Sequence, residues 1–417
     1  MKQQTTTLAE QVESFLVVLF AVSIFMWKPG IYVSSALIIV YTCIGIFRSQ
    51  DYRQKYFGSN ITVISLVMFV VGTTASLIAM QQTEDLLWTV RKTLFLLTVG
   101  FLLIAFNNKK NKKIAFYGLV AGFWVASLLT IFKNWQLMGV ITRVEGTWPQ
   151  GTWDALLGLF LIFLLLSIKD VFLNSVPSLR AKLFLFATLC MSIFQLIWAG
   201  GRIPFVACVV AILLYVLTLK LSKRMVINAM LASVIAIMFS VTIFKDHTDS
   251  LINRVQSITD VSNDDYWVRL NLWKVGFNHA VFFMKNEPST FLFGAGGKSY
   301  GPTQIEFFQD MPMNAVDREK FQSLGYPSGD PHNMYIDSIL KNGVIWTVLF
   351  LIYLLWLATG FKLKQSWQRP EPFILLSFYL VLGLAYTILP HFFTYFLVFF
   401  MMYFVSSKNP RRQTGLS

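Results

Sequence analysis

The chain has 417 residues, of which 55% are hydrophobic and only 13% are charged. Soluble globular proteins are typically about 25% charged, so this composition excludes an ordinary soluble domain. The net charge of +14 comes largely from lysines and arginines between apolar runs, and no basic arm or nucleic-acid module is present, so it does not indicate nucleic-acid binding. Three cysteines, all within apolar runs, predict neither a disulfide framework nor a metal site.

Apolar runs follow one another along the chain, each close to the length of a helix that spans a bilayer. We therefore expect an all-α polytopic membrane protein with about 12 transmembrane helices. The predicted spans are residues 13–27, 30–47, 61–80, 86–106, 114–132, 154–168, 182–199, 203–220, 225–244, 343–361, 372–389 and 391–406. They predict three parts: nine helices within 1–244, a large outer loop at 245–342, and three helices with a tail at 343–417. The first two spans meet at Lys28-Pro29-Gly30, a sequence typical of a turn.

Lysines and arginines gather in alternate connections between the predicted spans. If the N-terminus is cytoplasmic, the cytoplasmic connections hold most of them, because basic residues favour that side. The short outer connections hold only Lys28, Lys133, Arg143 and Arg202. This bias predicts that both termini face the cytoplasm.

The middle of the long outer loop has the pattern of a helix. Asn263-Asp264-Asp265 can cap its start, and Asn286-Glu287-Pro288 can end it. Apolar residues between them recur at steps of three and four, at Tyr266, Leu270, Trp273, Phe277, Val281 and Met284. We expect an amphipathic helix on the outer leaflet; the alternative is a core helix of a small soluble cap.

Three arginines on the outer side could bind a diphosphate, since guanidinium stays charged and binds phosphate in a bidentate manner. Arg202 follows Gly200 and Gly201, which would allow backbone to approach a ligand; the alternative is an arginine that reaches lipid head groups. Arg143 precedes an ordered Gly-Thr-Trp-Pro loop, although it could instead pair with Glu145. Arg269 lies on the predicted amphipathic helix, where a merely solvated charge is the alternative.

His332 stands at a predicted helix start, after the turn Ser328-Gly329-Asp330-Pro331 and before Asn333. A histidine can accept or donate a proton near neutral pH, and Asp330 or Asn333 could orient its ring. We expect His332 to be catalytic. His247, His279 and His391 lack such a context and are expected to be structural.

Other chemistries find little support in the sequence. The first outer connection has no acid, and the acids of the long outer loop do not form a tight Asp-x-Asp pair on a membrane-facing loop that would hold Mg²⁺ or Mn²⁺. No Walker loop is present. We therefore expect neither a metal nor a cofactor, and we expect arginine to stabilise a leaving diphosphate.

These residues resemble the bacterial O-antigen ligase family. Its histidine motif has His followed by Asn, Ser or Gln, then nine residues, then Gly-x-x and a Gly, Thr or Tyr. His332-Asn333 and Gly343 fit this pattern, and Trp346 departs from it at the last position. Residues 293–296 resemble the family's Gly-x-Gly stretch, and residues 199–202 are similar to its Ser/Thr-x-Ser-Arg element, with glycine in place of hydroxyl residues. Arg143 and Arg269 are at positions where the family has its other outer arginines, and the likeness covers roughly residues 140–360.

The resemblance implies a glycosyltransferase of the GT-C type in the inner membrane of a Gram-negative bacterium, with its active site facing the periplasm. The donor would be O-antigen polysaccharide on undecaprenyl diphosphate, and the acceptor a sugar hydroxyl of lipid A–core oligosaccharide. His332 would be the general base, and Arg202, Arg143 and Arg269 would hold the diphosphate. Alternatives are an O-antigen polymerase, which extends a lipid-linked glycan by the same chemistry, a transporter of lipid-linked polysaccharide, and a purely structural scaffold.

Overall fold

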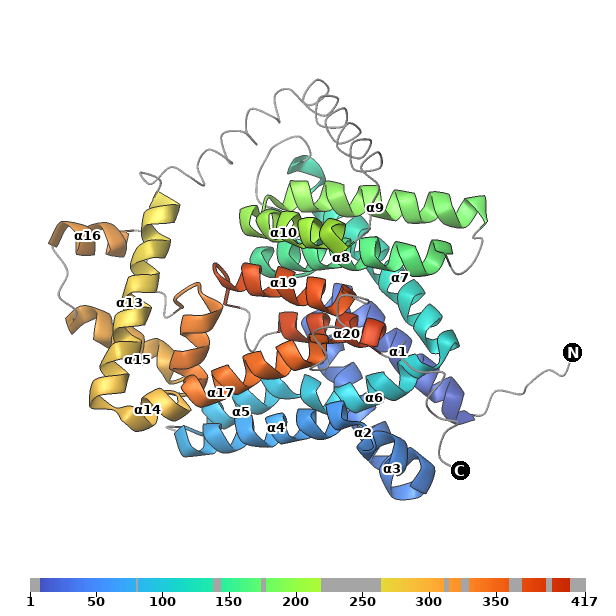
Figure 1. Cartoon of the computed structure of the whole chain (residues 1–417). Helices are drawn as coiled ribbons and strands as arrows, with labels where there is room; N and C mark the ends of the chain where they lie inside the picture. Colours follow the sequence, from blue (N-terminus) through green and yellow to red (C-terminus); the bar gives the residue numbers. More distant parts are fainter. Residues whose placement is uncertain are drawn as a thin grey trace, which may run out of the picture.

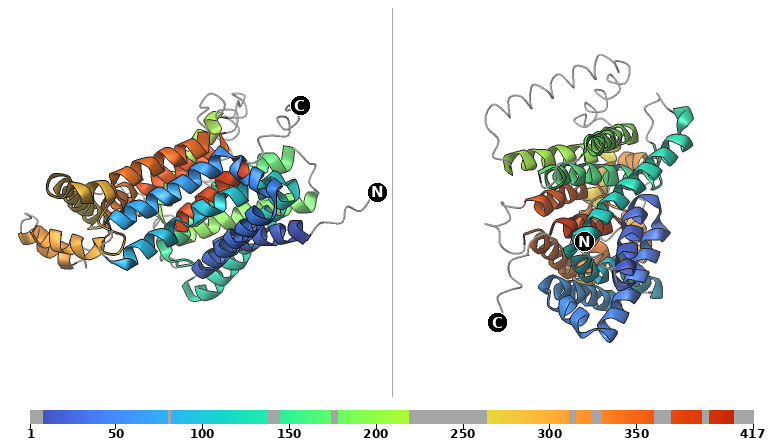
Figure 2. Two further views of the ribbon diagram at one scale, coloured as in Figure 1. Left: turned by 90° about the horizontal axis from the view of Figure 1, so that it is seen from below. Right: turned by 90° about the vertical axis from the view of Figure 1, so that its right-hand side faces the viewer.

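The computed structural model describes residues 8–79, 82–137, 144–173, 178–218, 264–310, 315–323, 330–359, 370–387 and 392–405, and within these ranges the fold is all-helical. The helices are α1 (Leu8–Met26), α2 (Lys28–Arg48), α3 (Gln50–Phe57), α4 (Asn60–Ala79), α5 (Thr83–Thr93), α6 (Phe95–Asn107), α7 (Lys109–Lys133), a 3₁₀ turn (Trp135–Leu137), α8 (Gln150–Leu173), α9 (Leu179–Ala199), α10 (Arg202–Thr218), α13 (Asp264–Asn286), α14 (Pro288–Phe293), α15 (Tyr300–Asp310), α16 (Ala315–Ser323), α17 (Met334–Thr359), α19 (Glu371–Gly383) and α20 (Phe392–Val405). Most of the described helices pack side by side as a bundle, and α13–α16 lie together at one end of it (Figures 1 and 2).

The apolar runs of the sequence form these helices. Within the described part of the chain, seven helices are long and apolar enough to cross a membrane, and four more are apolar but shorter. Together they cover every predicted span except 225–244, which lies outside the described residues. The all-helical membrane character is therefore confirmed.

The predicted turn between the first two spans is wrong in detail. Only Trp27 separates α1 from α2, and Lys28, Pro29 and Gly30 form the first turn of α2. Proline is tolerated there because the first amides of a helix have no partner within it.

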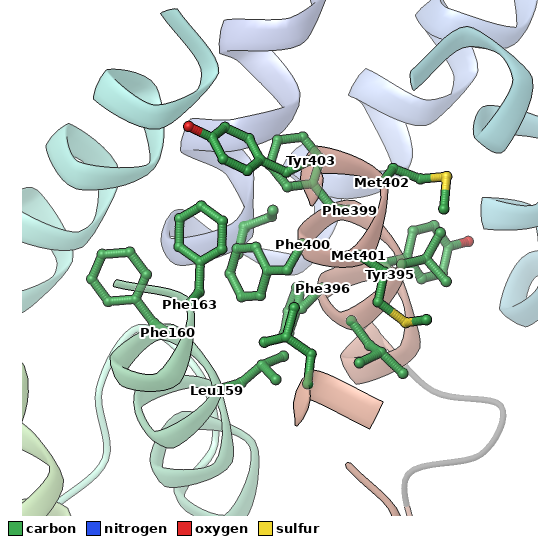
Figure 3. Close-up of a cluster of buried hydrophobic side chains, with 14 of the residues drawn as sticks. Leu159, Phe160, Phe163, Tyr395, Phe396, Phe399, Phe400, Met401, Met402 and Tyr403 are labelled. Atoms are coloured by element: carbon green, nitrogen blue, oxygen red, sulfur yellow. The ribbon is translucent and has the colours of Figure 1, made fainter. Parts of the chain in front are cut away.

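The helix α20 occupies the centre of the bundle. All its residues are buried, as expected of a helix that is apolar on every side. The ring of Phe400 stacks on Phe163 of α8 at 4.6 Å, and Phe399 stacks on Phe20 of α1 at 5.3 Å. Figure 3 shows this cluster of aromatic residues between α8 and α20. The aromatic contacts thus hold α20 in the core, and α20 follows α19 in the chain.

The helices α17 and α19 lie between two groups of helices. On one side α17 contacts α4, and on the other α19 contacts α8 and α10. Figure 1 shows the same order across the bundle. The ends of α17 and α19 therefore lie between these two groups.

Glycines allow α17 to pack against the end of α14. Gly343 has a φ of 82° and divides α17 into two helical segments, and Gly294 has a φ of 96° after α14. A Cβ on either glycine would collide with the facing backbone. The amide of Ala295 donates to the carbonyl of Leu340 at 2.8 Å, which satisfies a carbonyl freed by the break.

The helix predicted in the outer loop is present as α13, but the apolar stripe from the sequence is not its packed face. Leu270, Phe277 and Met284 of that stripe are exposed. The buried face consists of Val268, Leu272, Val275, His279 and Phe283. It packs on α14, α15 and α17, so α13 has apolar residues on both sides.

Candidate active site

His332 has an unusual backbone conformation just before α17. Its φ is 48°, and it is the one described residue other than glycine with a positive φ. Such a conformation costs about 1–3 kcal/mol and persists only where surrounding contacts hold it. The Asp330 carboxylate accepts the His332 amide at 2.8 Å, and the Trp273 indole donates to the His332 carbonyl at 3.4 Å. Both backbone groups of His332 are thus fixed by neighbouring side chains.

The Asn333 side chain caps the start of α17 and also contacts the chain just after α19. Its carbonyl oxygen accepts the amides of Tyr335 at 3.0 Å and Ile336 at 3.1 Å, as in a helix N-cap. Its amide group donates to the carbonyl of Leu384 at 3.1 Å, just after α19. The expectation that Asp330 or Asn333 orients the imidazole does not fit these hydrogen bonds. The Asp330 carboxylate accepts the His332 amide and the Thr387 hydroxyl, and the Asn333 side chain binds backbone. No described residue hydrogen-bonds the imidazole.

The corner between α9 and α10 carries Arg202. Gly200 ends α9 in the left-handed conformation at a φ of 70°, and Arg202 is the first residue of α10 and half-buried. A Cβ on Gly201 would collide with the carboxylate of Asp154, the fifth residue of α8. Gly201 therefore makes room for a carboxylate of this chain, and the expectation that the two glycines let backbone approach a ligand stays a prediction.

The end of α19 connects the Arg202 corner to the His332 turn. The hydroxyl of Tyr386 donates to Asp154 at 3.1 Å, and the hydroxyl of the next residue, Thr387, donates to Asp330. Two consecutive residues thus contact the two carboxylates that define these sites. These contacts bring the neighbourhoods of Arg202 and His332 together, although the two residues are 130 positions apart in the sequence.

Arg269 lies on α13, the helix whose Trp273 contacts the His332 carbonyl. It lies one turn before Trp273, on the same helix face, and it is half-buried. Arg143 lies outside the described residues. In the loop that follows it, Glu145 lies 3.9 Å from Lys133, and the Trp148 indole donates to the carbonyl of Ile24 at 2.9 Å.

A buried aspartate that the sequence analysis missed holds the loop before α15. The Asp85 carboxylate accepts the amides of Lys298 at 2.8 Å and Ser299 at 3.0 Å, and the Ser299 hydroxyl at 2.6 Å. A Cβ on Gly296 would collide with the same carboxylate. The Gly-x-Gly stretch therefore positions backbone against Asp85 and α17, and its contacts here are with the protein itself.

Asp85 and Asp154 share with Arg202 the sequence context that made that arginine a candidate. Asp154 is a single acid and Asp85 follows Glu84, and both lie at the edge of an apolar run, where an ionisable group is costly and commonly functional. Asp85 is completely buried and Asp154 is 2% exposed. Among the described residues, no cluster of three or more His, Cys, Asp or Glu could hold a metal ion.

Comparison with known families bears directly on this arrangement. Residues 185–351 match the family described as O-Antigen ligase. The expected relationship to that family is therefore confirmed, and the match includes Arg202, Arg269, His332 and Gly343. No curated protein matches the chain at a significant level.

The departure from the family's motif at Trp346 has a structural explanation. The indole of Trp346 is buried, stacks on Phe350 at 4.6 Å, and occupies the space beside Gly72 of α4. A Cβ at position 72 would collide with it. The large residue is thus accommodated by a glycine on the facing helix. The apolar helices and the family together indicate a multi-pass membrane protein of the O-antigen ligase and polymerase superfamily.

Proposed function

We propose that this protein is an O-antigen ligase, which transfers polysaccharide from undecaprenyl diphosphate to a sugar hydroxyl of lipid A–core oligosaccharide. In this proposal it is a GT-C-type glycosyltransferase with twelve spans in the bacterial inner membrane. Both termini are cytoplasmic, and the site around His332 faces the periplasm. The O-antigen ligase match over residues 185–351 supports the reaction class, and the paucity of basic residues in the short outer connections supports the orientation.

His332 acts as general base in the proposed reaction. An imidazole nitrogen takes the proton of the acceptor hydroxyl, and the oxygen attacks the anomeric carbon of the donor sugar. The bond from that carbon to the diphosphate oxygen breaks with inversion, and undecaprenyl diphosphate leaves. Arg202, Arg269 and Arg143 bind the diphosphate as negative charge develops on its oxygen. The reaction requires neither a nucleotide nor a metal, because the sugar–diphosphate bond is already activated.

The observation that carries the proposal is the pair Tyr386 and Thr387. These consecutive residues contact the Asp154 carboxylate beside the Arg202 corner and the Asp330 carboxylate beside His332. His332, the proposed base, and Arg202, a permanent cation, therefore lie beside carboxylates that contact the same two-residue segment. The strained φ of His332 supports a functional role, because strain of this kind clusters at active sites.

Reconstituted transfer tests the role of His332. Purified full-length protein in proteoliposomes would receive undecaprenyl-diphosphate-linked glycan and lipid A–core. We expect His332→Ala to abolish glycan transfer while binding undecaprenyl diphosphate as the parent protein does. Transfer to lipid A–core by the variant at the parent rate would refute the general-base role. If the parent protein elongated the lipid-linked glycan and transferred none to lipid A–core, the reaction would be that of a polymerase.

A matched pair of arginine variants tests the diphosphate site. We expect Arg202→Lys to weaken binding of undecaprenyl diphosphate, because lysine keeps the charge but loses the bidentate geometry. The control is Arg180→Lys at the opposite end of α9, which is exposed. Equal binding by both variants would mean that Arg202 does not contact the donor.

A further inference from the structure

A second group of cations lines a cavity away from Arg202. The cavity has a volume of about 520 Å³ and lies between α2, α5, the start of α20 and the loop before α15. Lys28, Arg91, Lys92 and Lys298 are among its lining residues. Its volume falls in the range of about 300–1,000 Å³ that is common for ligand sites.

The aromatic residues of the cavity hold two of these cations in place. The ammonium group of Lys92 lies 4.4 Å from the centroid of the Phe392 ring, and that of Lys28 lies 5.5 Å from the same centroid. Lys92 also lies 5.8 Å from the Trp88 ring. Cation–π contacts position the ammonium groups without neutralising them.

The positive charge of the cavity has no counter-charge in its walls. None of the described lining residues is acidic, and none of the four cations takes part in an ion pair with a described residue. The buried carboxylate of Asp337 interacts with Lys92 but is already paired with Lys341 at 2.5 Å. Like charges around one partly apolar cavity repel one another, and an anionic ligand would offset that repulsion.

The cavity is on the opposite side of α17 and α19 from Arg202. Arg202 begins α10, which contacts α19, whereas α17 contacts α4, which in turn contacts α5 (Figure 1). In an inverting transfer the attacking oxygen and the leaving group approach opposite faces of the donor sugar. The acceptor would therefore bind on the side of the reaction centre away from the diphosphate, which is the side of this cavity.

The cavity is also joined to the segment that carries His332. Lys298 belongs to the loop that Asp85 holds, and in the same loop the amide of Gly296 donates to the carbonyl of Lys341 at 3.2 Å. Lys341 follows His332 by nine positions, which is about 13 Å along a helix. The loop that lines the cavity is thus hydrogen-bonded to the helix that begins beside the proposed base.

We infer that this cavity binds a phosphate group of the lipid-anchored glycan acceptor, at a site separate from the donor diphosphate. This inference rests on the proposed ligase reaction, because that reaction supplies the acceptor. Lysine binds phosphate as a point charge, and arginine adds bidentate hydrogen bonds. The cavity would thus select acceptors that carry phosphate near the sugar that receives the polysaccharide.

Binding measurements on full-length protein in nanodiscs test the inference without turnover. The variants are Arg91→Gln and Lys298→Gln, whose parent side chains are exposed, together with Lys92→Gln. The control is Lys285→Gln, an exposed cation at the end of α13 that does not line the cavity. The probes are lipid A–core, the same glycolipid after chemical removal of its phosphates, and undecaprenyl diphosphate.

We expect each cavity variant to bind lipid A–core about 10- to 100-fold more weakly, the size of effect of a charged hydrogen bond. The parent protein should bind the dephosphorylated acceptor more weakly than lipid A–core by a similar factor. Removal of the phosphates should weaken binding by the cavity variants only slightly further. The control variant should bind both acceptors as the parent does. His332→Ala should retain full acceptor binding, so a failure of the proposed chemistry would leave this result intact.

Two outcomes would overturn the inference. Equal binding of phosphorylated and dephosphorylated acceptor to the parent protein would show that phosphate is not recognised. Weaker binding of undecaprenyl diphosphate by the cavity variants, with unchanged acceptor binding, would place the donor in the cavity. If Lys92→Gln fails to fold, the two exposed positions still decide between these outcomes.

Discussion

Tyr386 and Asp154, 232 positions apart in the sequence, are joined by a hydrogen bond of 3.1 Å from the phenol hydroxyl to a carboxylate oxygen. The same carboxylate fills the space beside Gly201, so it fixes the backbone immediately before Arg202. Asp154 thereby controls where α10 begins relative to the end of α19. The position of Arg202 depends on a residue that lies outside the matched family segment.

Replacement of Gly201 tests this control. Gly201→Ala would place a methyl group against the Asp154 carboxylate, and we expect transfer activity to fall about 10- to 100-fold through displacement of Arg202. Gly301→Ala is the matched control, because a Cβ at position 301 meets nothing within 4 Å. Glycan transfer by the two purified variants is the measurement. Equal activities would show that the contact with Asp154 has no effect on the site.

The clamp on the His332 backbone can be tested through Asp330. Asp330→Ala removes the acceptor of the His332 amide, and we expect kcat to fall about tenfold because an interaction of this kind is worth about 1 kcal/mol or more. Asp330→Asn keeps an acceptor oxygen and should retain most of the activity. The control is Asp310→Ala at the exposed end of α15. Similar losses for Asn and Ala would indicate that charge, and not backbone geometry, is the contribution of Asp330.

The helices of this fold could be predicted from the sequence because each apolar run specifies its own element. A run of this length and composition forms a helix in a bilayer whatever its neighbours are. The packed face of α13 could not be predicted in the same way. Leu270 and Phe277 have helical spacing, but so do Leu272 and Val275, and only the positions of α14, α15 and α17 determine which face is buried.

The candidate site was predictable only in part for a related reason. His332 and Arg202 stand out locally, because each follows a turn or glycine pair at the end of an apolar run. Asp85 and Asp154 act through partners more than 200 positions away, at Ser299 and Tyr386. Periodicity and local motifs carry no information on such pairs.

The pairing of Gly72 with Trp346 makes a prediction about the departure from the family's histidine motif. We expect Gly72→Ala to lower the free energy of unfolding by about 1–3 kcal/mol, because the added methyl group overpacks the contact with the indole. In a Trp346→Thr background the same change should cost much less, since the smaller side chain leaves room. Thermal unfolding of the four proteins in detergent measures this coupling. Additive effects would mean that the two positions do not constrain each other.

The last prediction concerns pH and the buried His279 of α13. Its ring is 1% exposed and stacks on Phe307 at 4.3 Å, and its Nδ1 has no hydrogen-bond partner among the described residues. Burial lowers the pKa of His279 from 6.5 to about 4, because the charged imidazolium loses its hydration.

The unfolded chain therefore binds this proton at a higher pH than the folded chain does. The contribution of His279 to stability is complete above pH 6.5 and decreases as the pH falls from 6.5 towards 4, by an amount on the order of 2 kcal/mol. His279→Phe keeps an aromatic ring in the stack and removes the titrating group. We expect the melting temperature of the parent protein to fall more steeply over this pH range than that of the variant, as measured by intrinsic fluorescence in detergent. Parallel pH profiles would show that His279 is hydrated or protonated in the folded protein.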